Sequence, residues 1–180
     1  MTTAPEAIEV HAVPHPAKEV RRFGFPLDHP YLEECWAPAL GPSSVLLLRH
    51  CVALWRDSMP ARVDSEDLAR QLGLGRGTGR HSPLTHTIER LVRFRFASMA
   101  SPGELDVFTD VPPLPLRTLE RLPSWSRGRH EHLLGQHLDG LARASATAPA
   151  LNEQPANVRM AQHLDRLANQ VGTQAPSLGR

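Results

Sequence analysis

The sequence predicts a mainly α-helical fold that includes one small β-hairpin. Three observations within residues 64–107 support this prediction: a capped helix start at Asp64, a second helix start at Ser82 and Pro83, and two β-prone runs joined by a turn signal. Polar caps and proline both favour the first turn of a helix. We therefore expect the order helix, turn, helix, hairpin in this part of the chain.

The first of these helices follows Asp64. Carboxylates occupy its first turn, where they suit the positive end of the helix dipole, and Leu68 and Leu72 then recur at helical spacing. Gly73 can adopt the left-handed backbone conformation that ends a helix. This helix is therefore expected to end just before Gly73.

The second helix begins at Ser82 and has one apolar face. Ser82 is the expected N-cap, and Pro83 occupies the first helical position. The apolar stripe, which any small helical domain needs for packing, is formed by Leu84, Ile88, Leu91 and Val92. Arginine side chains project from the remaining surface of this helix.

The hairpin follows the second helix directly. Residues 94–100 and 105–109 are β-prone, and Ser101-Pro102-Gly103-Glu104 between them is a turn signal. The two runs are expected to pair as antiparallel strands. The hairpin turn carries no arginine, and Glu104 and Asp106 of the hairpin would repel phosphate.

The regions before the hairpin set the expected bounds of the domain. Residues 1–22 mix proline and charge without sustained periodicity, so we expect a disordered arm. Residues 23–111 form the ordered domain, whose first long helix begins after Gly41 and ends near Asp57 with apolar residues on several faces. Residues 59–63 form a short connection, which can include a small strand that pairs with the hairpin.

Residues 112–144 are expected to form a C-terminal helical extension. A proline-rich exit precedes a short helix, and a longer helix begins at Trp125 and ends at Arg143. This longer helix folds back on the domain or meets its copy in a second subunit. Residues 145–180 comprise a linker, a short amphipathic helix over residues 157–171, and a tail.

Positive charge is concentrated around the second helix, although the net charge of the chain is only +1. Between Arg76 and Arg95 there are five arginines, and Glu89 is the one acidic residue. Binding to nucleic acid depends on such local charge rather than on net charge. The side chains that can reach base edges from a helix in the major groove are Thr85, His86, Glu89, Arg90 and Arg93. The side chains expected to hold phosphates are Arg76, Arg80 and Arg95.

The loop of residues 73–81 between the two helices is longer than the turn of about three or four residues in a compact helix-turn-helix. Two interpretations are open: a flexible loop that carries Arg76 and Arg80 to a phosphate backbone, or a surface loop without a partner. Its glycines do not make a nucleotide site, because the loop has no Gly-Lys-Ser/Thr ending and does not match the dinucleotide fingerprint.

Metal binding and catalysis find little support in the sequence. Cys35 and Cys51 match no metal spacing and are expected to be buried thiols. His130, His132 and His137 lack the i, i+4 spacing of a helical metal site, so we expect solvated histidines. Without a nucleophile motif, we expect no enzyme, no cofactor and no metal.

No apolar run approaches the roughly 20 residues that span a bilayer, and the first residues lack a signal sequence. A cytoplasmic protein without a membrane partner is therefore expected.

Residues 64–74, with the sequence DSEDLARQLGL, resemble the positioning helix and turn of bacterial winged helix-turn-helix proteins. Residues 82–93 follow as the recognition helix, and the arginine-rich, lysine-poor composition is similar to that of actinobacterial proteins. The resemblance covers Gly41 to about Val111 and implies recognition of double-stranded DNA, usually by a dimeric transcriptional regulator. The alternative is a non-catalytic module that uses the winged-helix scaffold and the Trp125 to Arg143 helix to contact another protein.

Overall fold

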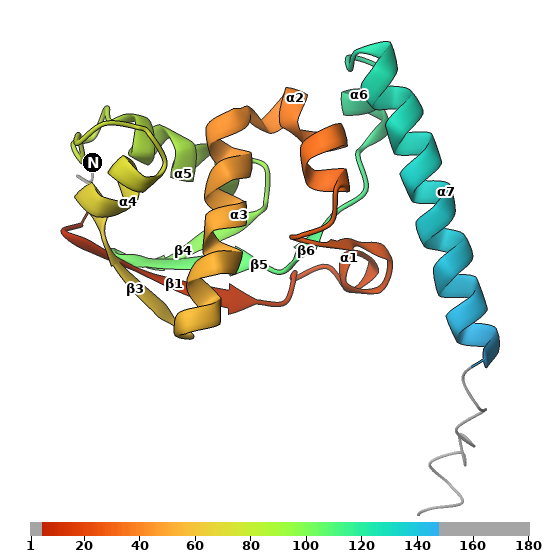
Figure 1. Cartoon of the computed structure of the whole chain (residues 1–180), viewed down its shortest axis with the longest axis horizontal. Helices are drawn as coiled ribbons and strands as arrows, with labels where there is room; N and C mark the ends of the chain where they lie inside the picture. Colours follow the sequence, from red (N-terminus) through yellow and green to blue (C-terminus); the bar gives the residue numbers. More distant parts are fainter. Residues whose placement is uncertain (1–4, 148–180) are drawn as a thin grey trace, which may run out of the picture. The chain divides into compact units, whose positions relative to one another are not determined.

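The structure is a computed structural model that describes residues 5–147 (Figure 1). The chain divides into two units, Met1–Gly140 and Leu141–Arg180, and every strand of the described range belongs to the first unit. Helices predominate in the described range, beside a small mixed sheet. The prediction of a mainly α fold with a small β-hairpin is therefore confirmed.

Four strands form the main sheet, in the spatial order β3 (Ala61–Asp64), β1 (Ala7–Val13), β5 (Glu104–Phe108) and β4 (Ala97–Ser101). β1 pairs antiparallel with β3 and parallel with β5. β4 and β5 form the predicted antiparallel hairpin, with Gly103 in its turn at a φ of +93°. Such a φ suits glycine, because glycine has no Cβ to clash with the backbone.

The first strand shows that the predicted disordered arm of residues 1–22 is wrong for residues 7–13. β1 occupies an interior position in the sheet, with Ile8 and Val10 buried and Glu9 and His11 half-buried. This alternation is the two-residue period of a strand with one covered face. The strand is short, and both of its partners lie far along the chain, so local periodicity did not identify it.

The strand considered for residues 59–63 forms as β3, but its predicted partner is wrong. β3 pairs with β1 and does not pair with the hairpin. The reason is that β1 lies between β3 and β5, at the position where direct pairing with the hairpin would otherwise occur.

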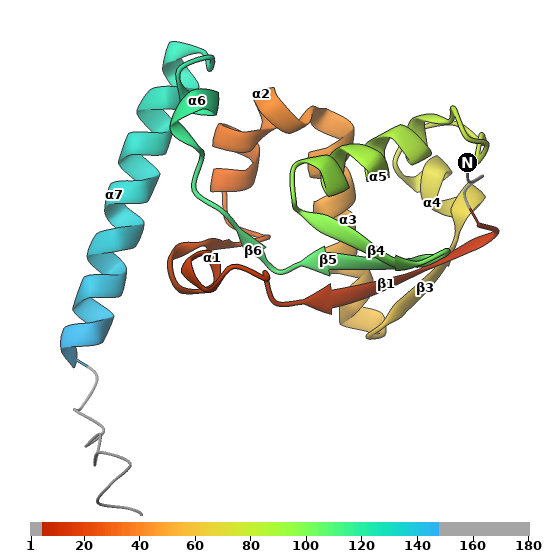
Figure 2. The same cartoon turned by 180° about the vertical axis from the view of Figure 1, so that it is seen from behind.

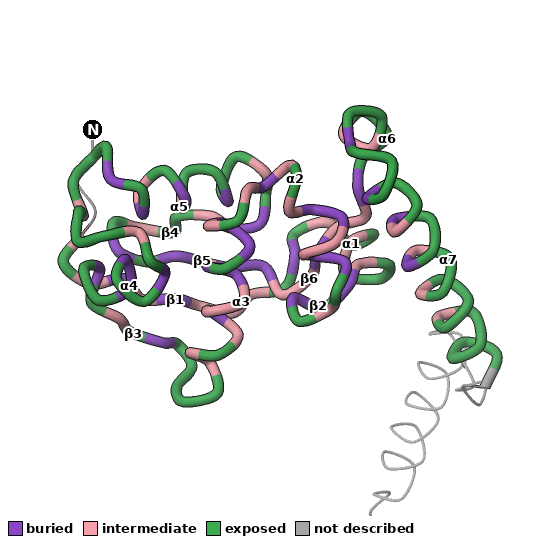
Figure 3. The backbone as a smooth tube through the Cα atoms, turned by 45° about the horizontal axis from the view of Figure 1, so that its top comes forward, coloured by how far each residue is buried: buried purple, intermediate pink, exposed green. Residues whose placement is uncertain are grey.

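Three helices cover one face of this sheet: α3 (Pro42–Asp57), α4 (Ser65–Gln71) and α5 (Pro83–Arg93) (Figures 1 and 2). The predicted helix after Gly41 corresponds to α3, and the two helices of the predicted helix-turn-helix order correspond to α4 and α5. In the first part of β1 and of β5, buried residues alternate with less buried ones, as expected for a sheet that helices cover on one face (Figure 3).

The predicted helix ends are confirmed at atomic level. The Asp64 carboxylate accepts a hydrogen bond from the Asp67 N–H at 2.9 Å, and Ser82 Oγ accepts one from the Thr85 N–H at 3.1 Å. Gly73 follows α4 with a φ of +68°, as expected for a residue that ends a helix. Local sequence signals therefore set both helix starts.

Short elements connect β1 to α3. β2 (Phe25–Pro26) and β6 (Asp110–Val111) form a two-stranded antiparallel pair, and the segment that follows Tyr31 is π-helical. The connecting elements are α1 (Lys18–Phe23), β2, the π-helical segment Leu32–Trp36 and α2 (Ala37–Leu40), whereas β6 follows β5 in the chain.

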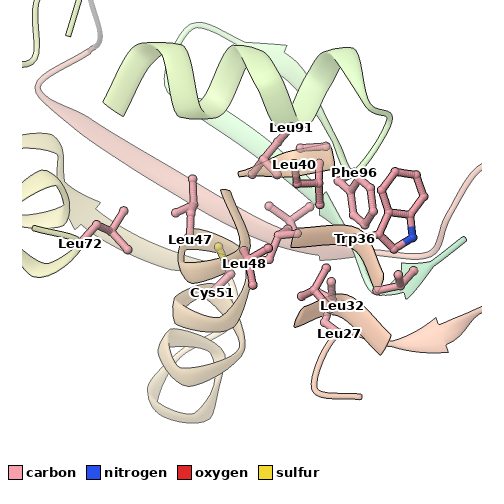
Figure 4. Packing of buried hydrophobic residues seen from close by; sticks show 14 of the residues in the cluster. Leu27, Leu32, Trp36, Leu40, Leu47, Leu48, Cys51, Leu72, Leu91 and Phe96 are labelled. Carbon is pink, nitrogen blue, oxygen red and sulfur yellow. The ribbon is translucent and has the colours of Figure 1, made fainter. Parts of the chain in front are cut away.

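The hydrophobic core lies between α3, the π-helical segment, α5 and the sheet (Figure 4). Trp36 packs edge-to-face against Phe96, with ring centroids 5.0 Å apart, and its indole N–H donates to the Pro112 carbonyl at 2.8 Å. Cys35 and Cys51 are free and buried, as predicted. The core therefore packs against the apolar side of α5.

The predicted C-terminal extension contains α6 (Leu116–Leu119) and α7 (Ser124–Thr147). Because α7 includes residues 145–147, the prediction that a linker begins at residue 145 is wrong for those residues, and the helix predicted over residues 157–171 lies outside the described part.

The expected solvated histidine face is also wrong at His130, which is buried and bonded to Tyr31. In the described range, no helix combines the length and apolar character needed to cross a membrane.

Candidate nucleic-acid interface

The surface of α5 is divided between a packed side and a solvent side. Leu84, Thr87 and Leu91 are buried, and Ile88 is half-buried against the core. Val92, predicted as part of the apolar stripe, is 37% exposed, because its place on the helix is at the edge of the packed side. The exposed residues on the other side are His86, Glu89, Arg90 and Arg93.

Hydrogen bonds at its first turn fix α5 against α3. Thr87 Oγ1 donates to the Pro83 carbonyl at 2.7 Å and lies 3.2 Å from Ser43 Oγ in the first turn of α3. At the other end of α5, the Phe96 N–H donates to the Leu91 carbonyl at 2.9 Å. The contact with Ser43 therefore joins α5 to α3, and the other two hydrogen bonds stabilise the ends of α5 itself.

All five arginines between residues 76 and 95 are exposed. Among the described residues, Arg93 and Arg95 have neither a hydrogen-bond partner nor an ion-pair partner for their guanidinium groups. Arg95 has a φ of +60°, a left-handed conformation that turns the chain from α5 toward β4. Both guanidinium groups can bind an anion without first giving up a partner.

Arg90 is held in place by the neighbouring helix end. Its Nη1 donates to the carbonyl of Leu40, the last residue of α2, at 3.2 Å. Gly41 next to it has a φ of +80°, and a Cβ there would lie only 2.9 Å from Arg90 Nη1. The prediction that Arg90 reads bases from α5 is therefore revised: part of its hydrogen-bonding capacity closes the junction between α2 and α3.

Thr85 also has a structural contact that the sequence did not predict. Its hydroxyl donates to the Gly79 carbonyl at 3.1 Å and lies 2.9 Å from Ser82 Oγ. The predicted base-reading hydroxyl of Thr85 is instead engaged in fixing the end of the loop to α5. The hydroxyl proton is therefore not available to a base, although the hydroxyl oxygen can still accept a hydrogen bond and the methyl group can make apolar contact.

The loop of residues 73–81 is anchored at its beginning. Leu74 is half-buried against the core, and its N–H donates to the Ala69 carbonyl at 2.8 Å. Arg76 Nε lies 3.9 Å from Glu66 Oε1 at the start of α4, in an exposed ion pair. Arg80 is exposed beside the start of α5. The loop therefore exposes both arginines, with Arg80 beside the start of α5 and Arg76 beside the start of α4.

A hollow of about 270 Å³ lies where the N-terminal ends of α3 and α5 meet. Arg90 and His86 supply its cationic or protonatable groups, and Ser43 and Thr87 supply hydroxyls. A donor set of this kind suits a phosphate oxygen, since guanidinium and hydroxyl groups both donate hydrogen bonds. His86 Nδ1 lies 3.3 Å from Glu89 Oε2, so one carboxylate moderates the positive charge of this surface.

The described residues offer little for metal binding or nucleophilic catalysis. They contain no group of three or more His, Cys, Asp and Glu side chains arranged to hold a metal ion. Burial raises the pKa of the Cys35 thiol to about 11 and that of the Cys51 thiol to about 12. Both thiols are therefore protonated at neutral pH, and a protonated thiol is a poor nucleophile.

The structure also brings together residues that no sequence pattern groups. Pro5 and Ile8 from the start of the chain lie beside Ile88 of α5 and Met99 of the hairpin. No sequence signal joins them, because the neighbourhood depends on β1 pairing with β5.

Comparison with known protein families, with curated protein sequences and with solved structures finds no match to this chain.

Proposed function

We propose that this chain binds double-stranded DNA through α5, with the β4–β5 hairpin as a wing in a winged helix-turn-helix. The order α3, β3, α4, α5, β4 and β5 supports this proposal, as does the exposed polar side of α5. The fold differs from the simplest form of that scaffold by the long loop before α5 and by β1 within the sheet. Transcriptional regulation is the cellular role we propose for it.

One observation carries the proposal: the five arginines between residues 76 and 95 all reach solvent on or beside α5. Phosphate neutralisation by such side chains supplies most of the affinity of DNA-binding proteins for duplex. Glu89 is the one acidic residue in the same stretch.

The contacts divide the residues of the interface into two groups. Arg93, His86 and Glu89 remain available for base edges, because their side chains are exposed on the helix itself. Arg95, Arg80 and Arg76 flank the helix and suit phosphates. Arg90 suits a phosphate in the hollow shared with α3, since its guanidinium lies at that junction.

A salt titration of binding to random-sequence duplex tests the proposal. For the double variant Arg93→Ala, Arg95→Ala we expect weaker binding and a slope of log affinity against log salt reduced by about one unit, because Arg95 is the phosphate contact of the pair and each lost phosphate contact removes about 0.9 unit. The matched control is Arg117→Ala, Arg121→Ala, which removes two exposed arginines elsewhere in the described part of the chain.

The control should keep the wild-type slope, since its arginines lie in and after α6. Equal slopes for the wild type and the Arg93, Arg95 variant would overturn the assignment of this surface. No measurable binding of the wild-type chain at low salt would overturn the proposed function itself. Selection from a random duplex library then tests whether binding depends on sequence.

A second candidate is a protein-interaction module that uses α7. Trp125 is 62% exposed and Leu138 is 42% exposed on this helix. Exposed aromatic residues of this kind are enriched at protein interfaces, where they contribute much of the binding energy. Sedimentation of the wild-type chain and Trp125→Ala tests the homodimer form of this idea: a concentration-dependent dimer that the variant loses would support it.

A further inference from the structure

A hollow of about 430 Å³ lies between α5 and the tip of the hairpin. Three separate parts of the chain form its walls: the residues leading into β1, one side of α5, and the end of the hairpin. The lining residues used here are Pro5, Ile8, Ile88, Glu89, Met99 and Ala100. Its volume is within the range of about 300–1,000 Å³ that is typical of small-molecule sites.

The walls are joined by hydrogen bonds, so the hollow is formed without a ligand. The Glu9 N–H donates to the Gly103 carbonyl in the hairpin turn at 2.7 Å, which ties β1 to the hairpin. The hydroxyl of Ser65 donates to the Pro5 carbonyl, and the Ser65 N–H donates to the Glu6 carbonyl at 2.9 Å. A preformed site avoids the entropy cost of ordering its walls when a ligand binds.

The lining is apolar with one ionisable group. Ile8 is buried beneath the hollow, Ile88 is half-buried, and Met99 is 45% exposed at its edge. Glu89 is the only acidic or basic side chain of the lining. Among the described residues, the Glu89 carboxylate has no lysine or arginine as an ion-pair partner, and only His86 lies within ion-pair distance of it.

We propose that this hollow binds a small organic cation that combines an apolar body with one amino group. The ammonium group would pair with the Glu89 carboxylate, while the apolar body covers Ile88 and Met99. The carboxylate disfavours anionic ligands, including phosphates and fatty acids, because like charges repel. Binding of the cation does not depend on the proposed DNA binding; only its effect on DNA affinity rests on that function.

Binding of three matched probes to the full chain tests the site. We use 2-phenylethylamine, 2-phenylethanol and 3-phenylpropanoate at pH 7.5, with chemical shifts of the methyl groups of Ile88 and Met99 as the readout. We expect saturable binding of the amine, up to about five-fold weaker binding of the alcohol, and none of the carboxylate, since an exposed ion pair contributes up to about a five-fold change in affinity.

Two variants and one control distinguish a specific binding site from nonspecific hydrophobic binding. Glu89→Gln should reduce amine affinity to the level of the alcohol and leave the alcohol unchanged, whereas Glu104→Gln, an exposed carboxylate outside the lining, should change neither. Ala100→Trp should abolish binding of both probes, because Ala100 is an exposed residue of the lining whose enlargement fills the space.

The proposal is overturned if the amine does not saturate, if Glu89→Gln binds it as tightly as the wild type, or if Ala100→Trp retains binding. A further titration measures duplex affinity with and without saturating amine. For random-sequence duplex, in which Glu89 makes no sequence-specific base contact, we expect affinity to rise up to about five-fold, because the ligand cancels the negative charge of Glu89 on the solvent side of α5. Amine binding without this rise would overturn the coupling to DNA and leave the site intact.

Discussion

At the scale of single residues, Tyr31 shows how one buried hydroxyl can organise a contact between distant parts of the chain. Its oxygen accepts a hydrogen bond from the Leu114 N–H at 2.9 Å and lies 2.5 Å from His130 Nδ1 on α7. Burial raises the pKa of the Tyr31 hydroxyl, so Tyr31 keeps its proton. The hydroxyl therefore donates to His130 Nδ1, which requires the neutral imidazole.

Replacement of Tyr31 by phenylalanine tests this contact. The ring still stacks on Phe25, whose centroid lies 3.9 Å away, but the Leu114 N–H and His130 Nδ1 lose their partner. We expect the free energy of unfolding to fall by about 1–3 kcal/mol, the cost of leaving buried polar groups unsatisfied. Urea denaturation measures the change, and an unchanged unfolding midpoint would contradict the proposed role of the hydroxyl.

His130 should also make stability depend on pH. Burial lowers its pKa from the ordinary value of 6.5, so the folded state favours the neutral form more than the unfolded chain does. The contribution of His130 is complete above pH 6.5, and it is lost as the pH falls below 6.5 toward the lowered folded-state pKa. We expect the thermal midpoint of the wild type to decrease when the pH is lowered from 7.5 to 5.

His29 contributes to the pH dependence of stability in the same direction, because its pKa is also lowered, mainly by burial and further by the nearby His137. The control for His130 is His130→Gln, whose amide oxygen can accept from Tyr31 without titrating. This variant should lose part of the pH dependence and keep the part due to His29. An identical pH dependence in the wild type and the variant would show that His130 does not titrate between the two states.

At the scale of elements, α5 illustrates which features local sequence can predict. The caps at Asp64 and Ser82 and the stop at Gly73 depend on neighbouring residues only, and all three were predicted. The structural roles of Thr85 and Arg90 were not predictable, because their partners come from the loop and from α2. Sequence therefore identified the helix and its exposed arginines, but not which polar side chains were already engaged.

Loss of the α5 cap should weaken the start of the helix. Ser82→Ala removes the acceptor for the Thr85 N–H, and we expect about 1 kcal/mol less stability together with faster amide exchange in the first turn. Ser82→Asp should restore the cap, since aspartate caps as well as serine does. Ser58→Ala is the control, because Ser58 ends α3 without a side-chain hydrogen bond among the described residues. Equal exchange in Ser82→Ala and wild type would contradict the role of the cap.

At the scale of the whole first unit, β1 joins parts of the sheet that are far apart in sequence. Val10 pairs with Ala61 of β3 on one side and with Leu105 of β5 on the other, and it is fully buried. A composition-based reading of residues 1–22 could not find this strand, because only the later strands give it partners. The hollow beside Pro5 and Ile8 could not be predicted for the same reason, because it forms only when β1 pairs with the later strands.

An aspartate at position 10 tests the importance of β1 for the fold. Val10→Asp buries an unpaired carboxylate in the core, and we expect a loss of more than about 4 kcal/mol or an unfolded chain by circular dichroism. Glu9→Asp places the same side chain one position earlier, on the half-buried face, and should remain folded. A stable Val10→Asp variant with native spectra would mean that β1 is dispensable.

The place of β1 in the sheet has a consequence during protein synthesis. Glu9 is translated long before its neighbour Glu104, and a ribosome adding about 5–20 residues per second needs roughly 5–20 s to cover the interval between them. Throughout that time Ile8 and Val10 have no parallel partner to shield them. The nascent chain therefore exposes a short apolar segment near its start until the hairpin emerges, which makes this segment a natural place for a chaperone to hold.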